Sequence, residues 1–379
     1  MKPEPVTVTV PLADRSYPIV IGAGVLDRAG ELIAPVLRQP RVHIVADAAV
    51  AAIHLPRLEA ALDRADIAHA VTLVPPGEAS KSFSQFERLL DALLDARVER
   101  KTALIALGGG VTGDLAGFAA AVALRGIDFV QVPTTLLAQV DSAVGGKTGI
   151  DTRHGKNLVG AFHQPRLVIA DTAVLDTLPP REVRAGYAEV AKYGLIDRPA
   201  FWQWLEENGR AVIGDGVDLA ARDAARAHAI AESCRAKAEI VGADERESGA
   251  RALLNLGHTF AHALESLAGF GDAVRHGEAV GIGMVLAFAL SERLGLCPAG
   301  RAERVRAHLA AVGLPTSPAD IPVAYAPDAL YAAMLGDKKV EGGRIGFVLA
   351  RDIGRAFAAA DAPAEIVRAV LAEALEARR

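Results

Sequence analysis

The chain has 379 residues, 51% of them hydrophobic and 23% charged, with 41 Lys and Arg against 46 Asp and Glu, so that the formal net charge is −5. These proportions are those of a globular protein that is long enough for two domains. The slight acidity argues against a nucleic-acid-binding protein, which needs a basic surface to neutralise phosphates. Two cysteines, Cys234 and Cys297, cannot build a disulfide framework. Because the sequence shows neither a signal peptide nor an apolar run of membrane-spanning length, a cytoplasmic protein is expected.

The first half of the sequence alternates compact β-rich runs with helical stretches. The runs Val6–Val10 and Tyr17–Gly22 flank a turn-like segment and predict a hairpin. Apolar residues at helical spacing predict a helix over Ser82–Arg97. Further strands are expected at Arg41–Asp47, His69–Val74, Ala103–Leu107, Phe129–Val132 and Leu167–Ala170. Apolar strands that alternate with helices indicate a parallel sheet covered on both faces, which predicts an α/β domain over residues 1–178.

Beyond Pro180 helical periodicity dominates, and we expect an all-α second domain over residues 179–379. One short late hairpin is expected within residues 342–349. The predicted helices cover Glu182–Ile196, Leu219–Val241, Ala252–Leu267, Glu278–Leu294 and Arg301–Val312.

A glycine-rich segment follows the predicted strand Ala103–Leu107 and precedes a helical stretch. Gly108, Gly110 and Gly113 have the spacing of a dinucleotide-binding turn. Glycines let the backbone approach a pyrophosphate, and a helix N-terminus supplies free N–H groups. A tight strand-to-helix turn is the alternative. The next strand, Phe129–Val132, does not end in the acidic residue of the usual Rossmann pattern, so we expect a nucleotide site of another type.

A second glycine-rich segment, Gly145–Thr148, is not a P-loop, because Asp141 stands where that motif needs a glycine. Polar residues nonetheless gather around it: Asp141, Lys147, Lys156 and Asn157. They fit either a solvated loop or a binding site. The apolar character of residues 136–144 favours the site.

Charged residues also occupy unexpected helical positions in the second half. Glu189 and Lys192 share one face of a predicted helix, as a surface ion pair or a functional pair would. Lys237 falls in an apolar stripe, where a lysine either belongs to a site or extends its ammonium group to solvent.

Three histidines indicate a metal site. His258 and His262 are spaced i and i+4, which places both on one helical face, and His276 follows. Paired histidines at this spacing either bind zinc or pack without a ligand. With nearby acids, a catalytic metal with three protein ligands is a reasonable hypothesis.

Eight segments in this order resemble the 3-dehydroquinate synthase family over essentially the full length of the chain. They are Gly109–Asp114, Gln131–Ala138, Val140–Thr148, Gly155–Asn157, Ala188–Lys192, Asp244–Glu247, Asn255–His258 and His276–Val280. The resemblance implies an N-terminal Rossmann-like NAD-binding domain and a helical domain that binds metal and substrate.

The resemblance also implies residue roles. It assigns a Zn²⁺ ion, or Co²⁺, to Glu189, His258 and His276, and moves His262 to the substrate side. The implied NAD contacts are Asp47, Glu78, Lys81, Gly109, Gly110, Val111, Asp114, Thr134, Thr135, Lys156 and Thr177. The implied catalytic and substrate-binding residues are Arg125, Asp141, Lys147, Asn157, Lys192, Lys237, Glu247, Arg251, Asn255, His262, Lys338 and Lys339.

The family's reaction converts 3-deoxy-D-arabino-heptulosonate 7-phosphate to 3-dehydroquinate and phosphate. It proceeds by transient oxidation with NAD, loss of phosphate, re-reduction and aldol ring closure, so NAD is recycled. The resemblance further implies a homodimer in which Arg125 reaches the partner's substrate. Three alternatives remain: another sugar-phosphate cyclase, a metal-dependent polyol dehydrogenase, and a non-enzymatic NAD-binding protein.

Overall fold

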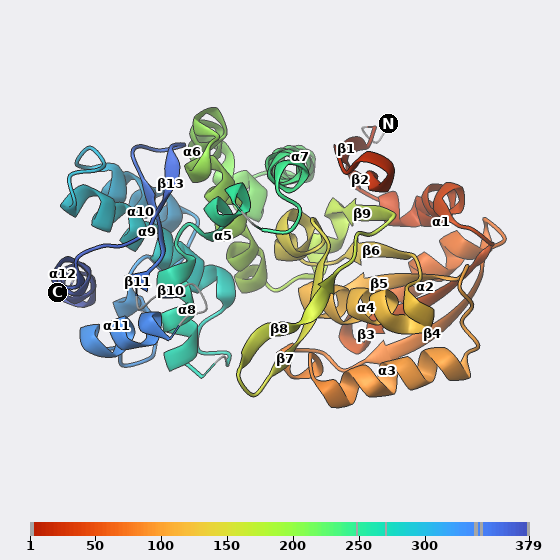
Figure 1. Ribbon diagram of the computed structural model, residues 1–379. Coiled ribbons are helices and arrows are strands. Elements are labelled where there is room, and N and C mark those ends of the chain that lie inside the picture. Colours follow the sequence, from red (N-terminus) through yellow and green to blue (C-terminus); the bar gives the residue numbers. More distant parts are fainter. Residues whose placement is uncertain (1–3, 248, 270, 337–339, 342–343, 377–379) are drawn as a thin grey trace. The chain divides into compact units, whose positions relative to one another are not determined.

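The computed structural model describes residues 4–247, 249–269, 271–336, 340–341 and 344–376, which form two compact units (Figure 1). The first unit runs to Leu178 and also includes Arg226–Arg246. The second unit consists of Pro179–Ala225 and the chain from Glu247 onward. Within the described residues, no helix is both long and apolar enough to cross a bilayer.

The first unit is built on a seven-stranded sheet with the strand order β1-β2-β9-β6-β5-β3-β4. Strands β1 and β2 are antiparallel, which confirms the predicted hairpin, and all other neighbours are parallel. The strand bounds are β1 (Val6–Val10), β2 (Tyr17–Gly22), β3 (Arg41–Asp47), β4 (Ala68–Val74), β5 (Ala103–Gly108), β6 (Phe129–Pro133) and β9 (Leu167–Asp171).

The inner strands of this sheet are buried on both faces, as the apolar strands predict, whereas the edge strands β1 and β4 are partly exposed. Successive residues alternate between the two faces, so Ile44 and Ile105 pack in one core while Val45 and Leu104 pack in the other. The first core includes residues of α1 (Ala29–Ile33) and α2 (Ala48–Asp63), and the second includes residues of α3 (Phe83–Asp95) and α4 (Gly110–Val122).

A hairpin of β7 (Lys147–Thr152) and β8 (Gly155–Phe162) was not expected from the sequence. Its glycines conceal it, because they lower β-propensity. They are needed where the two strands approach closely: a Cβ atom at Gly149 would lie 2.6 Å from the carbonyl oxygen of Val159. The second glycine-rich segment, Gly145–Thr148, therefore leads directly into β7.

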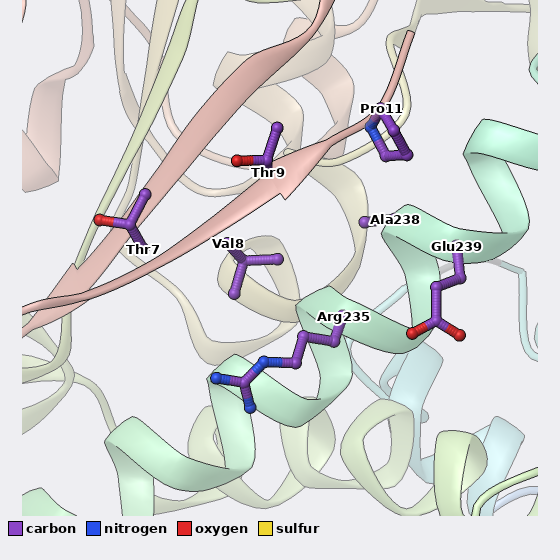
Figure 2. A pocket seen from close by; sticks show the side chains of 7 residues that line it. All are labelled: Thr7, Val8, Thr9, Pro11, Arg235, Ala238 and Glu239. Carbon is purple, nitrogen blue, oxygen red and sulfur yellow. The ribbon is translucent and has the colours of Figure 1, made fainter.

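Helix α7 (Leu219–Ala243) contributes its residues from Arg226 onward to the first unit, so the expected range 179–379 does not coincide with the second unit. Arg226 donates a 2.6 Å hydrogen bond to Asp176 near the start of this segment. Farther along, α7 lies beside β1 (Figure 2).

The second unit is mainly helical but not all-α, which corrects the expected fold class. Its described residues include two small antiparallel sheets, one of β10 (Val340–Glu341) and β11 (Arg344–Ile345), the other of β12 (Phe347–Ala350) and β13 (Ala356–Ala359). Its other helices are α5 (Pro180–Ile196), α6 (Pro199–Ile213), α8 (His258–Leu267), α9 (His276–Arg293), α10 (Arg301–Ala311), α11 (Pro327–Leu335) and α12 (Ala364–Glu376).

The helix predicted over Ala252–Leu267 is wrong in its first half. The chain forms a 3-10 helix over Ala250–Asn255, and α8 begins only at His258. Gly257 separates the two with a φ of +81°, a conformation that favours glycine. A Cβ atom at Gly257 would also lie 2.6 Å from the backbone nitrogen of Met284. The break therefore places His258 at the first position of α8.

Candidate active site

The glycine loop lies where ligands bind in open α/β sheets. Strand β3 is flanked by β4 on one side and β5 on the other, so the chain order reverses there. Ligands of such sheets bind beyond the carboxyl ends of the strands at this reversal. Asp47 ends β3, Gly108 ends β5, and Thr134 directly follows β6. The sheet therefore brings these three predicted segments to one edge.

The loop leaves polar groups available for a ligand. Helix α4 begins at Gly110, and a Cβ atom there would lie 2.8 Å from Ser142 Oγ. The buried hydroxyls of Thr112, Thr134 and Ser142 have no hydrogen-bond partner among the described residues. Buried polar atoms normally have partners. Together with the free N–H groups at the start of α4, these hydroxyls fit a nucleotide with phosphate groups.

Lys81 is the centre of a polar cluster beside this loop. Its side chain is only 3% exposed, and its Nζ donates a 2.7 Å hydrogen bond to Asp114 on α4 and a second bond to Asn157 Oδ1 on β8. Burial alone would lower the pKa of Lys81, but the carboxylates of Asp114 and Glu78 outweigh burial and raise it. Lys156 Nζ lies 3.9 Å from Glu78 Oε1. The structure thus brings together five predicted residues as a cationic centre held by acids.

Lys237 and Asp141 form a second polar pair in the first unit. Lys237 Nζ donates 2.5 Å hydrogen bonds to both the backbone oxygen and Oδ1 of Asp141, in the π-helical turn Ala138–Ser142. The lysine is 5% exposed, so the alternative that it extends to solvent is wrong. Next to it, Cys234 donates to the backbone oxygen of Gln139 at 3.3 Å, and burial raises the pKa of its thiol to about 12. Cys234 is therefore a packing residue, and Lys237 fixes Asp141.

Four other predicted residues of the first unit have different surroundings. Asp47 caps α2 by accepting the backbone N–H groups of Ala49 and Val50. Thr177 Oγ1 lies 2.9 Å from His54 Nε2. Lys147 is exposed at the start of β7. Arg125 is exposed after α4 with a φ of +71°, a strained conformation for a residue with a side chain.

Three candidate metal ligands meet in the second unit. Glu189 lies on α5, while His258 and His276 occupy the first positions of α8 and α9. Their ligand atoms all lie within 4.8 Å of one another. Glu189 Oε1 is 3.6 Å from His258 Nε2 and 3.4 Å from His276 Nε2. Helices α5 and α9 touch at Gly277, where a Cβ atom would overlap the carbonyl oxygen of Ala185.

The chemistry of this donor set fits a catalytic divalent metal. One carboxylate and two imidazoles are ligands that Zn²⁺ prefers, and three protein ligands leave a position for substrate. Glu189 is fully buried, and its Oε1, which faces both imidazoles, has no hydrogen-bond partner in the described part of the chain. His258 Nδ1 lies 3.3 Å from the backbone oxygen of Leu256. This contact leaves Nε2 of His258 for a metal.

Glu265 is a site residue that the sequence did not indicate. Its Oε2 lies 3.2 Å from His276 Nδ1, and its side chain is buried. A carboxylate in this position orients a metal-binding imidazole and increases its basicity. The spacing of Glu265 could have indicated it from the sequence, because it lies seven residues after His258, on the same face of α8.

The remaining predicted residues of the second unit differ in burial and in their contacts. Lys192 is 1% exposed and forms an ion pair with Glu189, so the alternative of a surface pair is wrong. The ring of His262 lies 5.7 Å from that of His258, outside the three-residue cluster. Arg251 is buried in the 3-10 helix that ends at Asn255. Glu247 is exposed with a φ of +61°. Lys338 and Lys339 lie outside the described residues.

A hollow elsewhere in the first unit contains none of the predicted residues. It has a volume of about 240 Å³ and lies between β1 and α7 (Figure 2). Its lining consists of Thr7, Val8, Thr9, Pro11, Arg235, Ala238 and Glu239. It lacks the metal-ligand and glycine-loop chemistry described above.

Comparison with solved structures defines the class of the protein. A 2-epi-5-epi-valiolone synthase from Streptomyces hygroscopicus with NAD⁺ and Zn²⁺ bound has a TM-score of 0.85 at 29% identity, covering 95% of this chain and 97% of that chain. A 2-deoxy-scyllo-inosose synthase complexed with carbaglucose-6-phosphate, NAD⁺ and Co²⁺ has a TM-score of 0.84 at 26% identity, covering 98% and 100%. A probable glycerol dehydrogenase from Sinorhizobium meliloti shares the fold alone, with a TM-score of 0.61 at 18% identity over 94% and 96%. The fold is thus that of the sugar-phosphate cyclases.

Sequence comparisons identify the family. The family models of the 3-dehydroquinate synthase N-terminal and C-terminal regions match residues 71–185 and 186–340. The 3-dehydroquinate synthase of Rhodospirillum rubrum is 63% identical over 371 residues, which cover 97% of this chain and 94% of that protein. That of Brucella ovis is 57% identical over 373 residues, covering 98% and 97%. The chain belongs to the 3-dehydroquinate synthase family, which confirms the resemblance found in its motifs.

Proposed function

We propose that this protein catalyses the conversion of 3-deoxy-D-arabino-heptulosonate 7-phosphate to 3-dehydroquinate and phosphate. The observation that carries the proposal is the convergence of Glu189, His258 and His276 in a chain 63% identical to a 3-dehydroquinate synthase. The more distant cyclases of known structure are only 26–29% identical, so their substrates are less suitable candidates.

The two cofactors of the proposed reaction have matching residues. A bound Zn²⁺ or Co²⁺ supplies Lewis acidity toward a substrate hydroxyl, and NAD supplies a hydride acceptor that is regenerated in each turnover. Glu189, His258 and His276 would hold the metal. The start of α4, with Gly109, Gly110, Val111 and Asp114, would bind the dinucleotide together with Asp47, Glu78, Lys81, Thr134, Thr135, Lys156 and Thr177.

The proposed substrate carries a carboxylate and a phosphate, and cationic side chains suit both groups. Lys192 and Arg251 are buried cations in the second unit, and Lys147 and Lys237 belong to the first. Arginine and lysine side chains recognise carboxylates and phosphates through charge-assisted hydrogen bonds. A polyol dehydrogenase acts on neutral substrates and does not need these cations, which weighs against that alternative.

Some polar residues are suited to transfer protons or to orient the hydroxyl groups of the substrate. Lys237 donates one hydrogen bond to the Asp141 carboxylate and one to its backbone oxygen, and these two contacts orient the carboxylate. Its remaining acceptor capacity suits a substrate hydroxyl. The family resemblance supports similar roles for Glu247 and His262, and it supports substrate binding by Asn157 and Asn255.

The homodimer, the cytoplasmic location and the two functional domains remain part of the proposal. Arg125 is exposed and its backbone is strained, so its side chain is not needed for packing. Strained residues often serve function, which supports a role of Arg125 in the dimer.

The test is direct. The protein is incubated with the heptulosonate phosphate, a divalent metal and trace NAD, and the products are identified by mass spectrometry and phosphate release. We expect dehydroquinate and phosphate in equal amounts. Stoichiometric accumulation of NADH, or no reaction with this substrate, would contradict the proposal and favour the dehydrogenase or another cyclase.

A further inference from the structure

The β7–β8 hairpin contains an irregularity at its most polar point. Ile150 pairs with Val159, and the next pair toward the turn is Thr152 with Gly155, so one residue of β7 stands opposite three residues of β8. The single residue is Asp151, and the three are Lys156, Asn157 and Leu158. Extra residues in one strand form a bulge, which bends the strand and redirects its side chains.

The bulge lets two consecutive side chains act on the same segment. Lys156 Nζ lies 3.9 Å from Glu78 Oε1, and the next residue, Asn157, accepts a hydrogen bond from Lys81. Successive side chains of a regular strand point to opposite faces. Because Glu78 and Lys81 belong to one turn of the chain, a regular β8 would direct only one of the two side chains toward it.

Asp151 holds the bulge through hydrogen bonds to backbone groups, one from its carboxylate and one from its own N–H. Its Oδ1 accepts the N–H of Asn157 at 2.8 Å, and its own N–H donates to the backbone oxygen of Lys81 at 2.7 Å. Asn157 has a φ of +55°, in the left-handed region, which asparagine tolerates better than most residues. Asp151 Oδ1 lies 4.0 Å from Lys81 Nζ, too far for a hydrogen bond. The carboxylate therefore acts on Asn157 through its backbone.

The orientation of the Asn157 amide follows from its partner. A lysine ammonium group has three donors and no acceptor, so Lys81 engages the carbonyl oxygen of the amide. The NH₂ group is then directed away from Lys81, on a residue that is exposed. Two N–H donors held in this way suit a hydroxyl, carboxylate or phosphate oxygen of a substrate.

We propose that Asp151 is a positioning residue that holds Asn157 in its left-handed conformation, so that the amide presents its N–H groups to a substrate oxygen while its carbonyl oxygen stays on Lys81. This inference rests on the proposed function, because the substrate oxygen belongs to that reaction. Asp151 itself does not touch the substrate, and its carboxylate acts on Asn157 by accepting the backbone N–H of that residue.

The test compares Asp151→Ala, Asp151→Asn and Asn157→Ala with the double variant of Asp151→Ala and Asn157→Ala. We expect kcat/KM to fall about tenfold in Asp151→Ala, the effect of one lost hydrogen bond. Asp151→Asn should stay within about threefold of the wild type, because its amide oxygen also accepts an N–H. In the Asn157→Ala background, Asp151→Ala should cause no further loss, because residues that act through one another are not additive. Arg153→Ala, at the exposed turn of the same hairpin, is the matched control and should keep wild-type activity.

A second measurement does not depend on turnover. Hydrogen exchange at the backbone amide of residue 157 should accelerate in Asp151→Ala and stay slow in Asp151→Asn, while exchange elsewhere in the first unit shows that both variants are folded. Equal losses for Asp151→Ala in both backgrounds, or an Asp151→Asn variant as inactive as Asp151→Ala, would overturn the proposal. A wild-type protein that forms no dehydroquinate would instead overturn the proposed function, and with it any catalytic effect of Asp151, whatever the exchange rates show.

Discussion

His308 should make the stability of the second unit depend on pH. Its Nε2 lies 2.9 Å from the hydroxyl of Tyr187, and its ring lies 4.7 Å from that of Trp202. Burial lowers the pKa of His308 from 6.5 to about 4 and raises the pKa of Tyr187, so the tyrosine donates to a neutral imidazole. Protonation would replace the imidazole acceptor with a second donor.

The sign and size of the effect follow from linkage. Above pH 6.5 the imidazole is neutral in both folded and unfolded chains, and it imposes no cost. As the pH falls below 6.5, the unfolded chain binds a proton that the folded chain rejects until about pH 4. The folded state therefore loses about 2 kcal/mol between pH 7.5 and pH 5, and about 3 kcal/mol when the loss is complete.

Tryptophan fluorescence isolates this effect. The two tryptophans of the chain, Trp202 and Trp204, both lie on α6, so their signal in urea unfolding reports on the second unit. Other groups titrate in the same range, and the measured quantity is therefore the difference in pH dependence between the wild type and His308→Gln. We expect that difference to be about 2 kcal/mol between pH 7.5 and pH 5.

A matched control replaces His154, an exposed histidine in the β7–β8 turn of the first unit, by Gln. This variant should retain the pH dependence of the wild type. The reasoning would be refuted if His308→Gln lost as much stability on acidification as the wild type does.

Three further predictions concern the active site. His258→Ala should abolish metal binding measured by elemental analysis, whereas His262→Ala should retain the metal and lose turnover; equal metal loss in both would restore the i, i+4 pair as ligands. Glu265→Gln should weaken Co²⁺ affinity by about 10- to 100-fold in a spectroscopic titration, because the carboxylate supports a metal-binding imidazole; an unchanged affinity would show that it does not. Arg125→Ala and Lys237→Ala should each be nearly inactive, but an equal mixture refolded together should recover about a quarter of wild-type activity if the two residues serve one site from different subunits. Confirmed heterodimers without activity would show that Arg125 serves its own subunit.

The parallel sheet was predictable because its strands are short, apolar and separated by clear turns. The bounds of β3 match the prediction, and those of β5 and β6 differ by one residue. The β7–β8 hairpin escaped prediction because close contact between its strands requires glycines, which carry no β-strand signal. Periodicity failed again at Gly257, since a single left-handed residue interrupts a helix without disturbing the apolar pattern around it.

The candidate site, like the fold, was predictable from the sequence only in part. Sequence spacing placed His258 and His262 on one helical face, but it could not show that Glu189 and His276 converge with His258. That convergence depends on contacts between helices that are far apart in sequence, and only resemblance to a family supplied it. Glu265 matched no quoted motif and became visible only through its contact with His276.

The contact between Gly277 and the backbone of Ala185 limits how this metal site can be moved or redesigned. Copying Glu189, His258 and His276 onto another pair of helices would reproduce the ligands without the separation that lets them share an ion. Any side chain at position 277 would force the two backbones apart, and the carboxylate and imidazole would separate with them. A designer would therefore have to transfer the helix spacing first, and a search for related sites would gain specificity by requiring a glycine directly after the last histidine ligand.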